Sequence, residues 1–278
     1  MKKISRRSFL AAAGLSVAAL ALTACGGSSA STASSVASSA SSAAASTSAA
    51  AGELTTVEAG KLTMATNAAF PPYEMTTDAG EFEGIDIETA QAIAEKLGLE
   101  LQIDDMDFDA ALLSVQQGKA DIVMAGVTVT DERKAVMDFS DSYATGIQSI
   151  IVPEGSDIAS PDDLAGKKIG TQRGTTGYIY CSDDFGDDNV VAYDDGLTAV
   201  QALNNGQVDA VVIDNAPAQE FVAANPGLVI LDTSYAEEDY AIGMAKGSSL
   251  EDAVNAALEE LKADGTLQSI VDKYITAE

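Results

Sequence analysis

The chain has 278 residues, of which 43 are acidic and 15 basic, so its formal net charge at pH 7 is −28. A surface of this charge repels nucleic acid and anionic lipid, which excludes nucleic-acid binding. The sequence contains no histidine, and histidine is the commonest general base and the commonest transition-metal ligand. We therefore expect a protein without a metal site or a cofactor.

The first 24 residues have the pattern of an export signal. Four basic side chains lie within the first seven residues, and an apolar run follows over residues 9–22. At about 14 residues this run is too short to cross a bilayer, which takes roughly 20, and it predicts a signal peptide over residues 1–24. Residues 5–10, Ser-Arg-Arg-Ser-Phe-Leu, are also similar to a twin-arginine signal, so both that route and the general export route stay open.

Cys25 follows Leu-Thr-Ala and resembles the lipidated cysteine of bacterial lipoproteins. Residues 26–52 are almost entirely serine, alanine, threonine and glycine, carry no charge, and cannot build a core. We expect the lipidated cysteine and a disordered tether to occupy residues 25–55, and such a coil reaches on the order of 30 Å. The protein is then expected to be extracytoplasmic and held at the membrane by its lipid alone.

Strands and helices alternate from Leu62 onward, which predicts an α/β fold. The runs at 121–125 and 208–213 are almost continuously apolar, as expected for parallel strands buried on both faces. About 225 residues follow the tether, enough for two lobes of ordinary size. The expected strands lie at 62–66, 99–103, 121–125, 168–172, 190–193, 208–213, 228–231 and 241–245.

Two helices are predicted by an apolar stripe with signals at its ends. In the first, apolar side chains recur at helical spacing over residues 87–97, and Gly98 ends the helix. The second runs on from Leu250, and we expect Ser249 and Asp252 to form a capping pair at its start.

Ligands of open α/β sheets bind beyond the carboxyl ends of the strands, so the residues after each strand are candidates for a site. After the strand at 121–125, Thr130 is expected to cap a helix whose first turn contains Arg133. A cation is unfavourable at the positive end of a helix dipole unless it meets an anion, and a guanidinium can hold a carboxylate by two parallel hydrogen bonds. The sequence leaves open whether that carboxylate belongs to a ligand or to this chain.

Two more strand exits carry polar groups. Asp214 follows the strand at 208–213 and is suited either to hold an ammonium group or to cap the next helix. After the strand at 168–172, the turn at 173–177 (Arg-Gly-Thr-Thr-Gly) leads into a helix whose free N–H groups can bind an anion. An arginine, an acid and a hydroxyl-rich helix start at three strand exits form the complement of a zwitterion.

Five segments carry a specific resemblance to a known family. They are residues 65–73 (ATNAAFPPY), 84–87 (GIDI), 106–110 (MDFDA), 125–133 (AGVTVTDER) and 138–141 (DFSD). In these segments the chain resembles the polar-amino-acid binding proteins of bacterial ABC importers, which are members of solute-binding family 3 with the type 2 periplasmic-binding-protein fold. The match runs in order from about residue 61 to the C-terminus.

The resemblance implies two lobes that close on a ligand like a clamp and are joined by two hinge crossovers, near residues 143–148 and 236–241. Lobe 1 is then expected to comprise residues 56–145 together with 240–278, and lobe 2 residues 146–239. The implied partners are the permease and ATPase subunits of an importer, and we expect a monomer.

The resemblance also implies how the ligand's main-chain groups are held. Arg133 would pair with the α-carboxylate, helped by Thr128 and the backbone of Thr176. Asp214 would hold the α-ammonium group together with the backbone of Gly126.

Other residues would surround the ligand side chain. Phe70 and Phe108 would enclose it, and ordinary core packing is the alternative role for both. Asn67 would face the tip of the ligand, and Gln172 lies in a stretch that varies with specificity in the family. Glu74 would support the wall of the site.

The expected ligand is a polar amino acid, with glutamine, a basic amino acid and cystine as the candidates. Gln172 and Ile213 stand where glutamine binders can place a lysine and a histidine, which argues against a strict glutamine binder. An acidic ligand would require Arg173 to point inward, and a solvated arginine is the alternative. Cys181 has no partner if Cys25 carries lipid, and we expect it to be buried and inert.

We therefore expect a binding protein and not an enzyme. The main alternative is an exported cyclohexadienyl dehydratase, an enzyme that resembles this fold. It would need a carboxylic acid such as Glu74 to protonate a leaving hydroxyl. A third possibility is the amino-acid-sensing part of a receptor.

Overall fold

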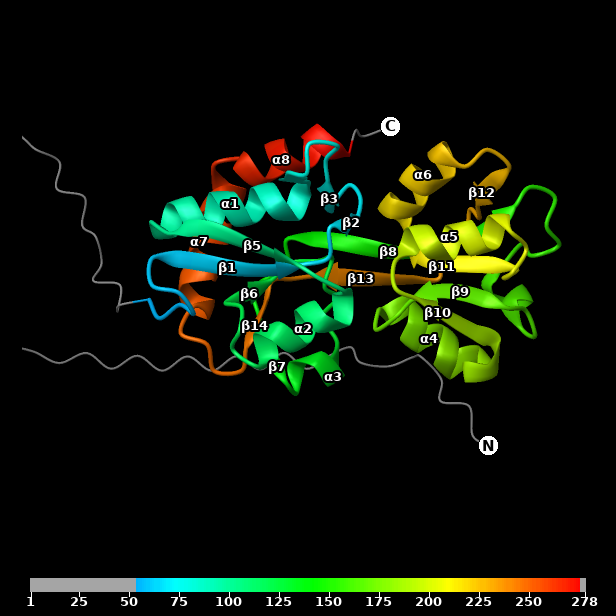
Figure 1. Cartoon of the computed structure of the whole chain (residues 1–278), viewed down its shortest axis with the longest axis horizontal. Helices are drawn as coiled ribbons and strands as arrows, with labels where there is room; N and C mark the ends of the chain where they lie inside the picture. The colour runs from blue at the N-terminus through cyan, green and yellow to red at the C-terminus, as the bar shows by residue number, and fades with distance from the viewer. Residues whose placement is uncertain (1–53, 276–278) are drawn as a thin grey trace, which may run out of the picture. The chain divides into compact units, whose positions relative to one another are not determined.

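The computed structural model describes residues 54–275. The predicted signal peptide, Cys25 and the predicted tether up to residue 53 lie outside the described residues. Within them, no helix is long and apolar enough to span a membrane. They form two lobes, each built on a β-sheet with helices packed against it, which confirms the predicted α/β clamp (Figure 1).

Lobe 1 is built on a sheet of five strands, β1 (Lys61–Thr66), β5 (Glu100–Asp105), β6 (Ile122–Val123), β7 (Met137–Phe139) and β14 (Gly243–Ala245). Their order in the sheet is β5-β1-β6-β14-β7. β1 pairs in parallel with β5 and β6, and β14 is antiparallel to β6 and β7. The chain therefore returns to this first sheet near its C-terminus.

Helices cover both faces of this sheet (Figure 1). Met64 packs in a core that includes residues of α1 (Ile85–Leu97), α7 (Glu251–Ala263) and α8 (Thr266–Tyr274). Its neighbour Ala65 packs instead with α2 (Phe108–Gln116). Successive side chains of a strand point to opposite faces, so the apolar runs in the sequence reflect a sheet buried on both sides.

The ends of two helices test the predicted caps. α1 ends at Gly98, which has a left-handed conformation with φ 72°, as predicted. The predicted capping pair of α7 is wrong, because no side chain caps this helix and neither Ser249 nor Asp252 takes that role. Leu250, which is buried in the core of lobe 1, stands at the helix start, and its N–H donates to Ser248 Oγ at 3.2 Å. Packing of this leucine, not a polar cap, sets where the helix begins.

A small three-stranded sheet precedes α1 and was not predicted. Its strands are β2 (Ala69–Phe70), β3 (Glu74–Thr76) and β4 (Phe82–Glu83). Gly84 links it to α1 with φ 130°, and a Cβ atom there would lie 2.2 Å from the carbonyl oxygen of Tyr73. Only glycine permits this approach. The contact seats the start of α1 beside β3 and brings Asp86 next to Glu74.

Lobe 2 is built on a second sheet, of β8 (Ala144–Pro153), β9 (Ile169–Gln172), β10 (Val190–Tyr193), β11 (Ala210–Asp214), β12 (Leu228–Ile230) and β13 (Ala236–Tyr240). The order is β10-β9-β11-β8-β12, with β13 also paired to β8. β9 is parallel to β10 and β11, whereas β8 is antiparallel to β11. Its helices are α4 (Thr176–Phe185), α5 (Gly196–Asn204), α6 (Asn215–Ala224) and two short 3-10 helices, Pro161–Leu164 and Asp187–Asn189.

Each strand expected from the sequence is present, although the one expected at 121–125 covers only Ile122–Val123. β8 and β13 were not predicted as strands. They pair antiparallel from Ala144 opposite Tyr240 to Gln148 opposite Ala236, in the two segments where the crossovers were expected. Both belong to the sheet of lobe 2, and the part in which they pair extends toward lobe 1 (Figure 1).

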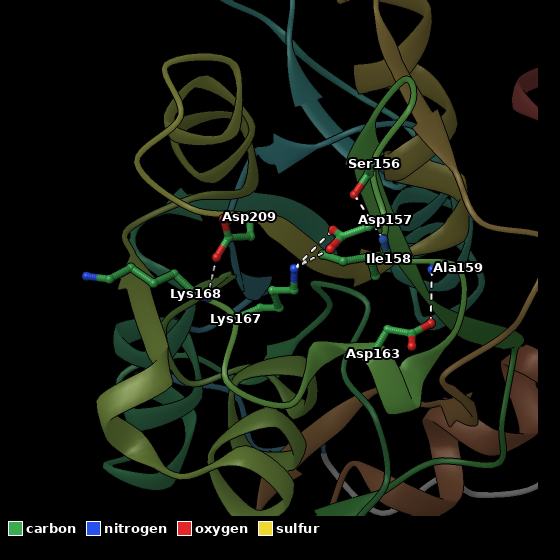
Figure 2. A network of polar contacts seen from close by, with 8 residues as sticks. All are labelled: Ser156, Asp157, Ile158, Ala159, Asp163, Lys167, Lys168 and Asp209. Atoms are coloured by element: carbon green, nitrogen blue, oxygen red, sulfur yellow. Dashed lines mark hydrogen bonds and ion pairs between the residues drawn. The ribbon is translucent and has the colours of Figure 1, made fainter.

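The end of lobe 2 remote from its strand exits is held by short polar contacts around the loop between β8 and β9 (Figure 2). Lys167 Nζ lies 3.0 Å from both carboxylate oxygens of Asp157, and the N–H of Lys168 donates to Asp209 Oδ2 at 2.7 Å. These contacts fix the amino end of β9, whose carboxyl end carries Gln172.

The first described residues lie at the amino ends of the parallel strands of lobe 1. Leu54 packs against the core, and the N–H of Val57 donates to Asp121 Oδ1 at 2.7 Å. The other oxygen of Asp121 accepts from the N–H of Thr63 at 2.8 Å. Asp121 directly precedes β6, so the chain enters lobe 1 at the amino ends of its parallel strands. Asn67 follows β1 at the opposite end, where these strands have their carboxyl ends.

Candidate ligand-binding site

One cavity lies between the two lobes, beyond the carboxyl ends of strands from both sheets. It is lined by all of the predicted ligand-binding residues: Asn67, Phe70, Phe108, Gly126, Thr128, Arg133, Gln172, Thr176 and Asp214. The lining also includes Glu74, Ala125, Gln148, Thr175, Val212, Ile213 and Tyr240, of which only Glu74 was assigned to the wall beforehand. Residues at the strand exits of both lobes therefore line one cavity, as is typical of ligand sites in α/β proteins.

Arg133 lies in the short helix α3 (Asp131–Lys134), whose predicted cap is confirmed: Thr130 Oγ1 accepts from the N–H of Arg133 at 3.1 Å. The Arg133 residue is only 9% exposed. Nη1 donates to Thr128 O at 2.8 Å, and Nη2 donates across the cavity to Gly174 O at 3.2 Å. The guanidinium carbon lies 5.4 Å from the centroid of the Phe108 ring, within range of a cation–π contact.

No ion pair to Arg133 occurs among residues 54–275, so the internal salt bridge that the sequence left open is not formed there. Burial lowers the pKa of Arg133, although a nearby negative charge on Glu238 partly opposes this. The guanidinium therefore donates to carbonyl oxygens and has no carboxylate within ion-pair distance among these residues, so it favours an anion entering the cavity.

Glu238 is a residue that the sequence did not single out. It lies on β13, is buried, and its Oε2 accepts hydrogen bonds from Thr128 Oγ1 at 3.0 Å, Thr176 Oγ1 at 2.9 Å and Gln148 Nε2 at 3.0 Å. One threonine belongs to each lobe, so this carboxylate links the lobes from the crossover strand. Because both hydroxyls already donate to Glu238, backbone N–H groups are what these threonines offer a ligand anion. The N–H of Thr176 lies in the first turn of α4, where it has no acceptor within the helix.

Asp214 takes one of the two roles that the sequence left open, the cap of the next helix. Its Oδ1 caps α6 by accepting from the N–H of Ala216 at 3.1 Å, and Oδ2 accepts from the N–H of Ile147 at 2.7 Å. The side chain also lines the cavity. Burial raises the pKa of Asp214 to about 6, and the hydroxyl of Tyr240 together with the two N–H groups holds it from rising further. Asp214 is therefore ionised at neutral pH and available to a cationic group.

Gly126 adopts a left-handed conformation with φ 55°. Its N–H donates to Asp86 Oδ2 at 3.0 Å, which fixes the loop after β6. A Cβ atom at this position would lie 2.9 Å from Phe70 Cε1 and 3.2 Å from Tyr240 Cε2. Glycine therefore lets the backbone approach the aromatic wall of the cavity.

The rest of the cavity lining has two parts, one formed by aromatic side chains and one formed by amide side chains. Phe70 stacks on Tyr73 with ring centroids 5.8 Å apart, and the buried Phe108 lies under Arg133. Asn67 and Gln172 meet across the cavity, where Gln172 Nε2 donates to Asn67 Oδ1 at 2.8 Å. An amide pair thus stands where a carboxylate would be expected for a strictly cationic ligand.

Residues 62–277 match the model of the bacterial extracellular solute-binding proteins, family 3. The chain belongs to this family.

Individual relatives of this solute-binding protein support the assignment. It is 33% identical over 226 residues to the L-cystine-binding protein TcyJ of Escherichia coli, covering 80% of this chain and 85% of the relative. It is 33% identical over 275 residues to a probable histidine-binding protein of Neisseria gonorrhoeae, covering 96% of this chain and 95% of the relative. A solved structure of an ancestral arginine-binding protein bound to glutamine shares 42% identity with a TM-score of 0.75, over 78% of this chain and 99% of the other. Like these relatives, the chain is a binding protein and not an enzyme.

Two residues considered from the sequence lie away from the cavity of this solute-binding protein. The side chain of Arg173 is 52% exposed and lies 3.6 Å from Asp194, so the solvated alternative holds and nothing at this position favours an acidic ligand. Cys181 is free and fully buried, and burial raises the pKa of its thiol to about 12. A thiol that stays protonated and covered is inert, as predicted.

Two carboxyl groups lie side by side behind the cavity. Asp86 is buried, and its Oδ2 accepts from Gly126 N–H and from the hydroxyl of Tyr143 at 2.8 Å. Glu74 is fully buried and lines the cavity. Burial, followed by the adjacent charge of Asp86, raises the pKa of Glu74 well above its usual range, and burial raises that of Asp86 to about 6. Among residues 54–275, no group of three or more such side chains is arranged to hold a metal ion.

Proposed function

We propose that this solute-binding protein is an extracytoplasmic lipoprotein that captures a polar amino acid by its α-carboxylate and α-ammonium groups and delivers it to an ABC importer. The observation that carries the proposal is that Arg133 and Asp214, of opposite charge, line one cavity from different lobes. Every α-amino acid carries the matching pair of charges. Arg133 has no anionic partner among the described residues, and Asp214 is ionised at neutral pH.

The ligand class is supported by both the lining and the relatives. In the proposed complex, Phe70 and Phe108 enclose the ligand side chain while Asn67 and Gln172 face its tip. The relatives' names mention cystine, histidine, arginine and glutamine, all of them polar amino acids. Glutamine, a basic amino acid and cystine are our candidates. An amide pair at the tip suits both neutral and cationic polar groups, because an amide donates and accepts.

The N-terminal part of the proposal rests on the sequence. Residues 1–24 serve as the signal peptide, Cys25 carries lipid, and residues 25–55 form the tether. Replacing Cys25 by alanine in the full chain is expected to abolish incorporation of labelled fatty acid and to leave the signal uncleaved before residue 25. Retention of the label in this variant would refute the anchor without touching ligand binding.

We also propose that residues 56–145 with 240–278 move as lobe 1 against residues 146–239 as lobe 2, and that the monomer docks on the permease and ATPase subunits. Support comes from the pairing of β8 with β13, which lies in the two segments where the chain passes between the lobes. Small-angle X-ray scattering with and without the ligand is expected to show a decrease in the radius of gyration on binding. An unchanged radius at saturation would argue against closure.

A thermal-shift screen tests the amino-acid proposal directly. The soluble domain is mixed with each of the twenty amino acids, cystine and ornithine. A ligand at a hundred times its Kd adds about 2.7 kcal/mol of stability, which is several degrees for a domain of this size. Arg133→Ala and Asp214→Ala are each expected to abolish the shift. The unliganded melting temperature is expected to stay nearly unchanged in Arg133→Ala and to fall by a few degrees in Asp214→Ala, which loses the cap of α6. A sharp drop in the unliganded melting temperature with a preserved shift would show that these residues are structural.

A further inference from the structure

We propose that Asn205 is a site of spontaneous covalent modification, at which the side-chain amide closes on the next backbone nitrogen, loses ammonia and opens to aspartate or isoaspartate. The site lies in the turn between α5 and β11. Gly206 of this turn lines the same groove as Asp157, at the end of lobe 2 remote from the ligand cavity. The inference concerns the ageing of the protein and goes beyond the proposed function without resting on it.

The side chain of Asn205 differs from those of the other asparagines. The chain has seven, all within residues 54–275, and Asn205 alone precedes a glycine. In the other six the side-chain amide is hydrogen-bonded; they are Asn67, Asn189, Asn204, Asn215, Asn225 and Asn255. Asn205 is exposed, and its side chain has no hydrogen bond within the described part of the chain. A free amide samples the rotamers that bring its carbonyl carbon to the next nitrogen.

The glycine after Asn205 is required by the way α5 ends. The N–H of Gly206 donates to Leu203 O at 3.0 Å, and the N–H of the following Gln207 donates to Ala202 O at 2.9 Å. These two bonds form a Schellman motif, which sets Gly206 at φ 68° in the left-handed region that favours glycine. A Cβ atom at Gly206 would have no neighbour within 4 Å. The residue that ends the helix therefore leaves the nitrogen next to Asn205 unshielded by a side chain.

The modification needs only this chain and water. The Gly206 nitrogen attacks Cγ of Asn205 and forms a C–N bond, while the Cγ–Nδ2 bond breaks and NH₃ leaves with the proton of the Gly206 N–H. The product is a five-membered succinimide ring. Water then adds to one ring carbonyl: breaking the new C–N bond gives aspartate, and breaking the original backbone bond gives isoaspartate. No electron is transferred.

The Schellman motif slows the reaction and is lost through it. The bond from Gly206 N–H to Leu203 O must open before the nitrogen can attack, and it lies in the last turn of α5, where helices fray. Isoaspartate adds one carbon to the main chain and so changes the spacing on which the motif depends. Either product also places a negative charge at the C-terminal end of the helix dipole, where it is unfavourable.

Two aspartates also precede a glycine and can close the same ring with loss of water. Their carboxylates are engaged: Asp195 Oδ1 accepts from the N–H of Thr198 at 2.6 Å, and Asp264 Oδ1 accepts from the N–H of Thr266 at 2.9 Å. Isomerisation of an aspartate leaves the mass unchanged, whereas conversion of Asn205 replaces NH₂ by OH and adds one mass unit. Mass spectrometry therefore separates the two.

Peptide mapping of the purified full chain during incubation at pH 7.5 and 37 °C follows the reaction. We expect Asn205 to gain mass about tenfold or more faster than any other asparagine, because the others are held by a hydrogen bond and lack a following glycine. Labelling by protein L-isoaspartyl methyltransferase, which methylates isoaspartate, is expected to rise in parallel. Asn205→Gln, whose side chain would have to close a larger ring, is expected to abolish both signals from this turn. Asn204→Gln is the matched control, one residue earlier, and is expected to age as wild type.

A synthetic peptide of residues 201–209 gives the rate without the fold. If this peptide is fully converted while the protein gains no mass at Asn205, or gains it first at another asparagine, the proposal is overturned. Mass gain without isoaspartate would show direct hydrolysis and overturn the ring closure. Aged wild-type protein is expected to melt a few degrees lower than aged Asn205→Gln, and equal melting temperatures would contradict the inferred loss of the Schellman motif.

Discussion

Replacing Arg133 by lysine separates the charge of this side chain from its shape. Both residues are cations, but only the guanidinium offers two parallel donors to a carboxylate. The substitution removes one charge-assisted bond to the ligand, about 1.5–3 kcal/mol, and the bond from Nη2 to Gly174 O that joins the lobes, about 0.5–1.5 kcal/mol. Together they amount to about 2–4.5 kcal/mol, which is roughly a 30- to 1,600-fold increase in Kd.

Calorimetric titration of Arg133→Lys with the amino acid found in the thermal-shift screen measures this increase. Lys134→Ala is the control, because Lys134 is exposed in the same helix and its loss tests only long-range attraction. We expect the control to stay within about threefold of wild type, as surface charges are screened. A Kd for Arg133→Lys that also stays within threefold would refute the bidentate geometry and leave Arg133 as a simple point charge.

Three further predictions concern other parts of the cavity. Gly126→Ala is expected to lower the unfolding free energy by about 1–2 kcal/mol because residue 126 has a left-handed backbone conformation, and to weaken binding by displacing Phe70. Thermal melts measure the first effect and titrations the second. Unchanged binding would show that Phe70 does not contact the ligand. Glu238→Ala is expected to raise the Kd about ten- to a hundredfold, because the closed protein loses the hydrogen bonds that Thr128 and Thr176, one from each lobe, donate to this carboxylate. Tighter binding in titrations would show instead that the carboxylate mainly repels the ligand. Acidification is expected to weaken binding about tenfold per pH unit below pH 6, where folded Asp214 becomes protonated. Between pH 6 and 4 it is expected to stabilise the unliganded protein, because the folded state binds that proton more tightly than the unfolded chain. Titrations and thermal melts that show no pH dependence across this range would contradict the raised pKa of Asp214.

The cavity was largely predictable because a simple rule of topology governs it. Asn67 and Gly126 follow apolar runs of one sheet and Asp214 follows a run of the other, and the exits of the parallel strands in each sheet meet at one edge of that sheet. That the two edges face each other was expected from the family resemblance, which implies two lobes that close on a ligand. The roles of the aromatic residues came from the family resemblance, since Phe70 and Phe108 have no feature that distinguishes them from core residues.

What could not be predicted depends on pairing between distant segments. Glu238 acquires its partners because β13 pairs with β8 in a register that sets Ala236 opposite Gln148, and no local pattern fixes that register. The sequence carries no local signal for it, because Glu237, Glu238 and Asp239 are all acidic, and only the structure shows that Glu238 lies on the buried face of the strand. The pairing of Glu74 with Asp86 likewise depends on Gly84, whose missing side chain lets the two elements touch.

The place where the chain enters lobe 1 has a practical consequence. Val57 is held through Asp121 at the amino edge of the sheet, while the cavity opens at the carboxyl edge. The entering segment therefore crosses neither β8 nor β13. A fluorescent protein or an immobilisation tag fused ahead of residue 54 is therefore expected to leave the proposed amino-acid recognition intact, which makes this end of the chain suitable for attaching a biosensor.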